Sequence, residues 1–273
     1  MIQNRAMLVD LTISQWTATK HDKAVSTEVE RNHAAKDAGR YNKRLIDKAH
    51  LATVSTLASQ IRSAHYARTL PWTDKGQRLL PSDLFMEYRQ EMASLKARFD
   101  QAVVDFVNQY PQLVQDARMR LGTMYDPADY PSPNDIHNSF HIALDFAPVP
   151  DAQDFRVDVA AEAQEEIRRQ ITEAVQARQV KAVKDCWARV REVVGRIAEQ
   201  CSKEKGRIHD SLMENAQALV DVLSGLNITK DPALTDIEQE IRSLIVPPDA
   251  LRNNPATRLR VATSAADILA KVQ

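Results

Sequence analysis

The feature that most constrains the fold is a stretch of about 48 residues, 157–204, that contains no proline and a single glycine, Gly195. Apolar side chains recur in this stretch at three- and four-residue steps, which is typical of an amphipathic helix. A helix of that length would span about 70 Å, which exceeds the diameter of a domain. We therefore expect either a kink near Gly195 or packing of the helix against partners.

The remaining C-terminal sequence predicts a return helix over 208–223, which would complete a long helical hairpin, and smaller helices over 235–245 and 256–271. The N-terminal part mixes strand and helix patterns. It predicts strands over 7–17 and 141–146 that pair in a small sheet, and a β-hairpin or rigid loop over 69–81. It also predicts helices over 22–38, 41–68 and 82–110, the last capped by Ser82 and ending before Pro111 or continuing to Leu121.

These patterns predict an α+β fold that is mostly α, divided into a basic domain at 1–155 and a helical oligomerisation domain at 156–273. The chain holds 6 glycines, which makes glycine-rich cofactor loops improbable, and 2 cysteines, which excludes a disulfide scaffold. We interpret Cys186 and Cys201 as core thiols. The hydrophobic fraction of 44% excludes wholesale disorder. We expect a non-membrane protein of the cytoplasm, with no cofactor.

Charge is unevenly distributed along the chain. Residues 1–78 hold 13 Lys and Arg against 7 Asp and Glu, whereas the whole chain has a net charge of -1. A basic segment in an otherwise acidic chain indicates a polyanionic partner, although an ordinary solvated helix surface would have the same composition.

Aromatic rings lie among the cations of this basic segment, a combination that single-stranded nucleic acid requires, since cations follow the phosphates and rings stack on bases. Arg40, Arg44 and Lys48 recur at four-residue steps and would share one face of the predicted helix. The expected phosphate contacts are Lys20, Lys23, Arg40, Lys43, Arg44, Lys48, Arg62, Arg68, Lys75 and Arg78, and the expected stacking rings are Tyr41, Tyr66 and Trp72. Trp16, on a strand, is interpreted as a core residue.

The sequence contains no nucleotide-binding glycine loop and no serine-hydrolase elbow, so we expect no enzymatic activity. His137 and His141 stand four residues apart, a spacing that would ligate a metal on a helix and leaves open a metal-dependent hydrolase. The prolines nearby argue against a continuous helix there.

The first 150 or so residues resemble a family of phage-encoded proteins of unassigned function. The resemblance lies in the segments 8–17, 38–43 and 66–72, together with Lys20, Asp22 and Lys23. One role proposed for such proteins is that of the Drc-type single-stranded DNA-binding RNA polymerase cofactor of podoviruses. The resemblance implies preferential binding of single-stranded DNA, a fold unlike the usual OB barrel, and recruitment of a phage RNA polymerase to melted promoters in the host cytoplasm.

We therefore expect a non-enzymatic, homo-oligomeric single-stranded DNA-binding protein that acts in phage transcription or replication. The alternative is an oligomeric helical structural or adaptor protein of a phage whose basic face meets protein.

Overall fold

The computed structural model describes residues 2–33, 36–37, 39–74, 76–154, 160–203 and 206–272. The fold is α+β and mostly α, with 71% of the chain helical and a small antiparallel sheet, as the sequence predicts. Two compact units are each assembled from separate stretches of chain. Unit 1 comprises 1–11, 64–90 and 144–273, and unit 2 comprises 12–63 and 91–143. The units alternate along the sequence and do not follow the boundary expected near residue 155.

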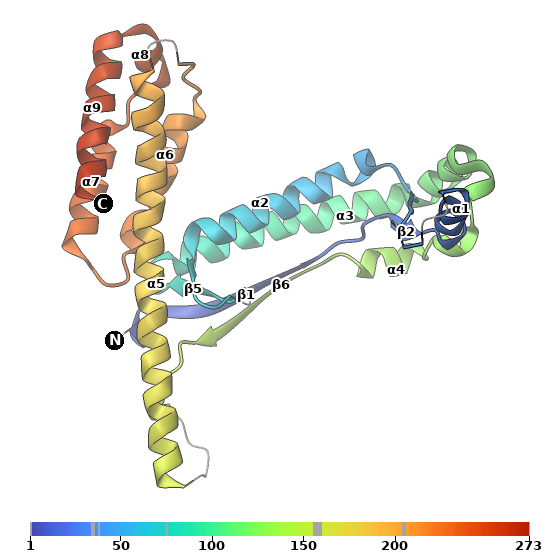
Figure 1. Ribbon diagram of the computed structural model, residues 1–273, viewed down its shortest axis with the longest axis horizontal. Coiled ribbons are helices and arrows are strands. Elements are labelled where there is room, and N and C mark those ends of the chain that lie inside the picture. The colour runs from blue at the N-terminus through green and yellow to red at the C-terminus, as the bar shows by residue number, and fades with distance from the viewer. Residues whose placement is uncertain are drawn as a thin grey trace. The chain divides into compact units, whose positions relative to one another are not determined.

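The larger sheet has the strand order β4-β5-β1-β6 (Figure 1). Its strands are β1 (Ala6–Ser14), β4 (Leu70–Pro71), β5 (Arg78–Pro81) and β6 (His141–Pro148). Leu79 of β5 faces Leu8 of β1 on one side and Leu70 of β4 on the other, in antiparallel register, and all three side chains are buried. This arrangement confirms the strands predicted over 7–17 and 141–146 and their place side by side in one sheet.

The connection between β4 and β5 is the predicted hairpin. The amide of Thr73 donates a hydrogen bond to the carbonyl of Gln77 at 3.1 Å, which closes the turn. Gly76 has φ of 102°, a backbone angle that residues with a Cβ rarely adopt, so glycine fits this position. The turn predicted around Asp74-Lys75-Gly76 is confirmed at Asp74 and Gly76, and Lys75 lies outside the described residues.

The helices that belong wholly to unit 1 are α5 (Ala161–Ser202), α6 (Ser211–Leu226), α7 (Pro232–Leu244), α8 (Pro248–Asn253) and α9 (Pro255–Lys271) (Figure 1). α5 runs as one helix through Gly195 and packs against α6 and α9. Its buried positions include Val190, Val194 and Ile197, together with Cys186 and Cys201, which confirms both cysteines as core thiols. α6 continues through Gly225, where a Cβ would lie 2.5 Å from the Leu84 side chain, so this contact requires glycine.

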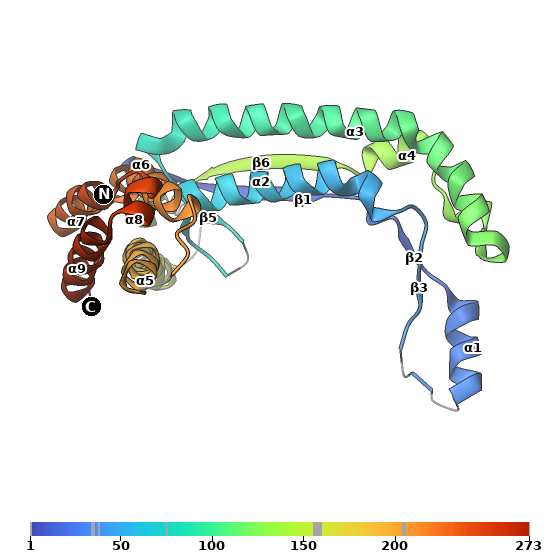
Figure 2. The same ribbon diagram turned by 90° about the horizontal axis from the view of Figure 1, so that it is seen from above.

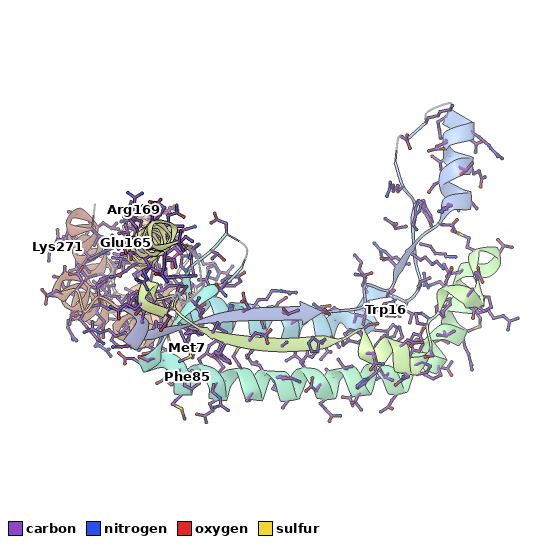
Figure 3. The ribbon with its side chains drawn as sticks, turned by 90° about the horizontal axis from the view of Figure 1, so that it is seen from below. Met7, Trp16, Phe85, Glu165, Arg169 and Lys271 are labelled. Carbon is purple, nitrogen blue, oxygen red and sulfur yellow. The ribbon has the colours of Figure 1, made fainter. Side chains whose placement is uncertain are left out.

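Unit 2 contains β2 (Thr19–His21), β3 (Asn42–Arg44), α1 (Lys23–His33) and α4 (Pro133–Asn138), with parts of α2 (Ala52–Arg68) and α3 (Phe85–Leu121). Its core gathers Ala18, Ile46, Leu51, Phe106, Tyr110, Leu113 and Ile136. Trp16, labelled in Figure 3, packs against Phe106 and Tyr110 with ring centroids 6.2 and 5.8 Å away, as expected for a core residue.

Short 3-10 helices complete the fold. They are η1 (Ile2–Asn4), η2 (Lys48–Leu51), η3 (Ser82–Leu84), η4 (Gly122–Met124), η5 (Pro127–Asp129) and η6 (Ala152–Asp154). Among the described helices, none combines the length and the apolar character that crossing a membrane requires.

The starts of two helices, α2 and α3, differ from those predicted, and the end of α3 was left open by the sequence. The helix expected from Tyr41 begins only at Ala52, because 42–44 pair as β3 and the Asp47 carboxylate accepts the Ala49 amide to begin η2. α3 continues through Pro111 to Leu121, which is the longer of the two extents that the sequence left open. Ser82 does not cap a helix; its hydroxyl donates to the carbonyl of Arg5 at 2.9 Å.

Candidate nucleic-acid interface

The structure divides the predicted nucleic-acid contacts between the two units. Unit 2 contains Lys20, Lys23, Arg40, Tyr41, Lys43, Arg44, Lys48 and Arg62, whereas unit 1 contains Tyr66, Arg68, Trp72 and Arg78. Lys75 lies outside the described residues. The two sets therefore belong to separate compact units and are described one after the other.

Six of the contacts expected in unit 2 lie in one excursion of the chain, residues 19–44, which we call the basic arm. β2 and β3 pair antiparallel at its base, with Thr19 opposite Arg44 and Lys20 opposite Lys43. Figure 2 shows α1 at the end of this two-stranded ribbon. α1 has no buried residue, so packing contributes little to its stability.

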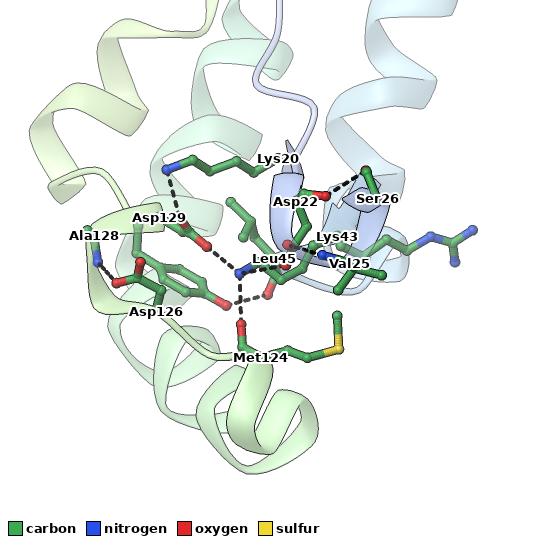
Figure 4. A network of polar contacts seen from close by, with 12 residues as sticks. Lys20, Asp22, Val25, Ser26, Lys43, Leu45, Met124, Asp126, Ala128 and Asp129 are labelled. Carbon is green, nitrogen blue, oxygen red and sulfur yellow. Dashed lines mark hydrogen bonds and ion pairs between the residues drawn. The ribbon is translucent and has the colours of Figure 1, made fainter. Parts of the chain in front are cut away.

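An aspartate from another part of unit 2 offsets the repulsion between the two lysines at the base of the arm, Lys20 and Lys43. Lysines directly opposite each other on neighbouring strands repel. Asp129 accepts both: its carboxylate oxygens lie 2.6 Å from Lys20 Nζ and 2.5 Å from Lys43 Nζ (Figure 4). Lys43 Nζ also donates to the carbonyl of Met124 at 2.7 Å and lies 3.8 Å from the Asp22 carboxylate.

This network shifts the pKa values of Asp129 and Lys20 in the directions that favour their charged forms. Burial acts to raise the pKa of Asp129, but the hydrogen bonds from Lys20 and Lys43 outweigh it and hold that pKa below its ordinary value. The hydrogen bond to Asp129 raises the pKa of Lys20. Lys43 is 5% exposed and fully engaged, so the expectation that it contacts phosphate is wrong; it anchors the arm instead.

The other cations of the arm have a different environment. Lys23, Arg31, Lys36, Arg40 and Arg44 are all exposed, and their charged groups form no ion pair or hydrogen bond with any described residue. Tyr41 lies among them with 42% of its surface exposed. The arm therefore offers the mixture of unpaired cations and an accessible ring that single-stranded nucleic acid requires.

The sequence predicted three of the exposed cations of the arm, but in part from a helical spacing that the structure does not have, and it missed the other two. Arg40, Arg44 and Lys48 do not share a helix face, because they lie before β3, in β3 and in η2. Arg31 and Lys36 were not predicted. Both lie within the helix predicted over 22–38, where exposed cations could have been read as candidates. Lys48 and Arg62 are exposed as well.

In unit 1 the predicted contacts are mostly engaged in the fold. Trp72 is 1% exposed, so the expectation that its ring stacks on bases is wrong; a large aromatic beside the hairpin is stabilised by burial. Arg78 donates to the hydroxyl and the carbonyl of Thr69 at 2.7 and 2.8 Å. Its guanidinium also lies 4.6 Å from the ring centroid of Tyr66, which is 52% exposed.

Other arginines of unit 1 bind backbone carbonyls at helix ends. Arg258 donates to the carbonyls of Gln200, Cys201, Lys203 and Gly206 at the end of α5. Arg189 donates to the carbonyls of Ala67 and Thr69 at the end of α2, at 2.8 and 2.7 Å. Gln200, Cys201 and Ala67 lie in the last turns of their helices, where backbone carbonyls lack partners within the helix. The other carbonyls belong to residues that follow those turns, so each arginine binds the C-terminal end of a helix.

Unit 1 also contains a buried histidine–tyrosine pair. His65 Nδ1 and the Tyr88 hydroxyl are 2.8 Å apart, and both side chains are buried. Burial, with a smaller contribution from Arg78, lowers the pKa of His65 to about 4, and burial raises the pKa of Tyr88 above its ordinary value. A neutral ring closed off from solvent serves the fold rather than acid–base chemistry.

The two histidines considered for a metal lie in different elements. His137 is in α4 and His141 begins β6, so the helical spacing is not realised. Within the described ranges, no three His, Cys, Asp or Glu side chains are grouped as a metal site requires.

Comparison with known proteins places the chain in a family. A family model described as "Protein of unknown function (DUF3150)" matches residues 3–228. The chain belongs to the DUF3150 family. The DUF3150 match includes the whole basic arm and ends between α6 and α7, so α7, α8 and α9 lie beyond it. No curated protein and no solved structure matches the chain.

Proposed function

We propose that this protein is a non-enzymatic, sequence-tolerant single-stranded DNA-binding protein and that the basic arm is its binding element. The observation that carries the proposal is the set of five exposed cations between Lys23 and Arg44 without ion pairs in the described chain. Cations of this kind displace condensed counterions when they meet phosphates, which is the main source of sequence-independent affinity.

The number of cations gives the proposal a quantitative form. Each neutralised phosphate of a single strand contributes about −0.7 to the slope of log affinity against log salt concentration, so five contacts predict a slope of about −3.5. The test is fluorescence anisotropy with a labelled oligothymidylate at several salt concentrations, beside duplex DNA and RNA of equal length.

Two double variants make the test specific to the arm. Arg40→Glu with Arg44→Glu should lower the affinity for single-stranded DNA at least tenfold and flatten the salt slope. Arg98→Glu with Arg118→Glu changes the net charge equally on exposed positions of α3 and should leave both almost unchanged. Equal loss in the two double variants, or no binding by the unmodified protein, would overturn the proposal.

The alternative of a helical adaptor is favoured by two exposed apolar side chains in unit 1, Val180 on α5 and Leu259 on α9, which are 55% and 67% exposed. An adaptor would show self-association in sedimentation equilibrium, weakened by Leu259→Ser, and no salt-dependent DNA binding. Homo-oligomerisation and recruitment of a phage RNA polymerase stay predictions of the sequence and the resemblance.

A further inference from the structure

A cavity lies within the basic arm, between α1 and the chain segment that returns to β3. It has a volume of about 360 Å³ and is lined by Ser26, Val29, Glu30, His33, Gly39, Arg40 and Tyr41. The four residues from α1 follow the spacing i, i+3, i+4 and i+7, so they form one continuous face of the helix. This volume falls within the range of small-molecule pockets.

Hydrogen bonds hold the two walls of the cavity together. The Tyr41 amide donates to Ser26 Oγ at 3.1 Å, and the Asp22 amide donates to the Tyr41 carbonyl at 2.9 Å. On the helix side, Glu30 Oε1 accepts the amide of Asp37 at 3.1 Å. The opening between Val29 and Tyr41 is therefore part of the folded arm.

The cavity combines apolar walls with nearby positive charge. Val29 and Tyr41, which both line this space, are 49% and 42% exposed and therefore accessible to a ligand. Arg40 is one of the lining residues. Arg31 lies on α1 and Lys36 follows that helix in the chain; both are exposed, and neither charged group forms an ion pair with a described residue. An apolar slot with a ring on one wall, beside cations, matches a flat aromatic group joined to a phosphate.

We infer that this cavity receives one unstacked nucleobase of the bound strand, with the base between the Tyr41 ring and Val29 and the adjoining phosphate at Arg40. The inference rests on the proposed function and names the subsite that the strand uses. Stacking against a side chain tolerates every base, so the subsite adds affinity without sequence specificity.

The experiment compares an oligothymidylate of about 12 nucleotides, a length within the site sizes of single-strand binders, with an abasic oligonucleotide of the same length and charge. The unmodified protein should bind the thymidylate at least fivefold more tightly. Tyr41→Ala should remove about five- to hundredfold of the thymidylate affinity, the range found for loss of one stacking ring, and should leave the abasic affinity and the salt slope unchanged.

Two further variants separate stacking from folding. Val29→Trp fills the cavity and should reduce the thymidylate affinity as Tyr41→Ala does, whereas Tyr41→Phe keeps the ring and should retain it. Phe146→Ala, at an exposed ring of β6 that was not expected to contact DNA, is the control and should have no effect. Circular dichroism checks that α1 is retained in each variant.

Equal binding of the two oligonucleotides by the unmodified protein, or unchanged thymidylate affinity in Tyr41→Ala, would overturn the base subsite and leave the arm's phosphate binding intact. Absence of binding to either oligonucleotide would instead overturn the proposed function, and the base subsite with it.

Discussion

The basic arm of unit 2 and the helical assembly of unit 1 use positive charge in opposite ways. In unit 1, Arg189 and Arg258 point their guanidinium groups at backbone carbonyls, and Arg78 is bound to Thr69. In the arm, Arg40 and Arg44 have no such partner in the described chain. Formal charge counted along a sequence therefore overstates the positive surface wherever arginines complete helix ends. A binding face is better indicated by cations whose acceptors are missing.

The largest effect on this comparison is expected at Asp129, the residue that anchors the arm. Asp129→Asn leaves the buried Lys43 ammonium without its carboxylate and should lower the free energy of unfolding by about 3 kcal/mol, near the lower limit for a broken buried pair because Lys20 reaches solvent. Urea denaturation measures this change. Asp105→Asn, an exposed aspartate on α3, is the control, and a loss equal to that control would contradict the anchor.

Protonation of the buried His65 ring in unit 1 should lower the free energy of unfolding. The folded protein holds His65 neutral with a pKa of about 4, whereas the unfolded chain takes up the proton near pH 6.5. The stability that depends on the neutral ring is complete above pH 6.5, falls as the pH is lowered towards 4, and changes no further below that. The expected loss is about 3 kcal/mol at most, from linkage.

Urea denaturation at pH 7 and pH 4.5 measures the His65 effect as a difference from His65→Gln. That variant removes the titrating ring but leaves the carboxylates, which also lose stability in acid. The pH-dependent part of the difference between the two proteins is then the contribution of His65. Parallel stability curves for the two proteins would show that the ring does not titrate as the structure requires.

Removing an arginine that binds backbone carbonyls should destabilise unit 1 without changing the affinity for single-stranded DNA. Arg258→Ala leaves several carbonyls at the end of α5 without donors and should lower the free energy of unfolding by about 2 kcal/mol, as for a lost charged hydrogen bond. Arg260→Ala, an exposed position on the same helix, is the control. A fall in DNA affinity in the folded Arg258→Ala variant would contradict the view that the arginines of unit 1 stabilise the fold while those of the arm bind DNA.

The smallest change in stability is expected in the arm itself. Arg31→Ala removes a cation that has no acceptor in the described chain, so the free energy of unfolding should change by less than about 0.5 kcal/mol. The same variant should weaken single-stranded DNA binding and reduce the magnitude of the salt slope by about 0.7. Thermal denaturation and anisotropy on one preparation test both expectations.

The features that the sequence predicted well depend on local pattern. The strand over 7–17, the Asp74-Lys75-Gly76 turn and the helix after residue 160 each follow from periodicity or from turn residues close together in the chain. The fold class followed because these patterns are long and consistent with one another.

The features that sequence reasoning missed depend on distant partners. Arg40, Arg44 and Lys48 have helical spacing, but Asp129 lies more than eighty residues along the chain from Lys43 and holds that segment as a strand. Trp72 stands among cations in the sequence, yet the fold buries it. The role of a cation is set by its acceptors, and neither charge nor spacing identifies acceptors that tertiary contacts supply.

The basic arm leaves the chain at Thr19 and rejoins it at Arg44, and these two residues face each other across an antiparallel pair. The backbone positions on either side of such a pair are about 5 Å apart. A short turn could therefore replace the whole excursion, provided that Asp129 were also changed to a neutral residue. By the same geometry, an arm moved to another sheet edge would need an acceptor placed as Asp129 is, since Lys20 and Lys43 both rely on that carboxylate.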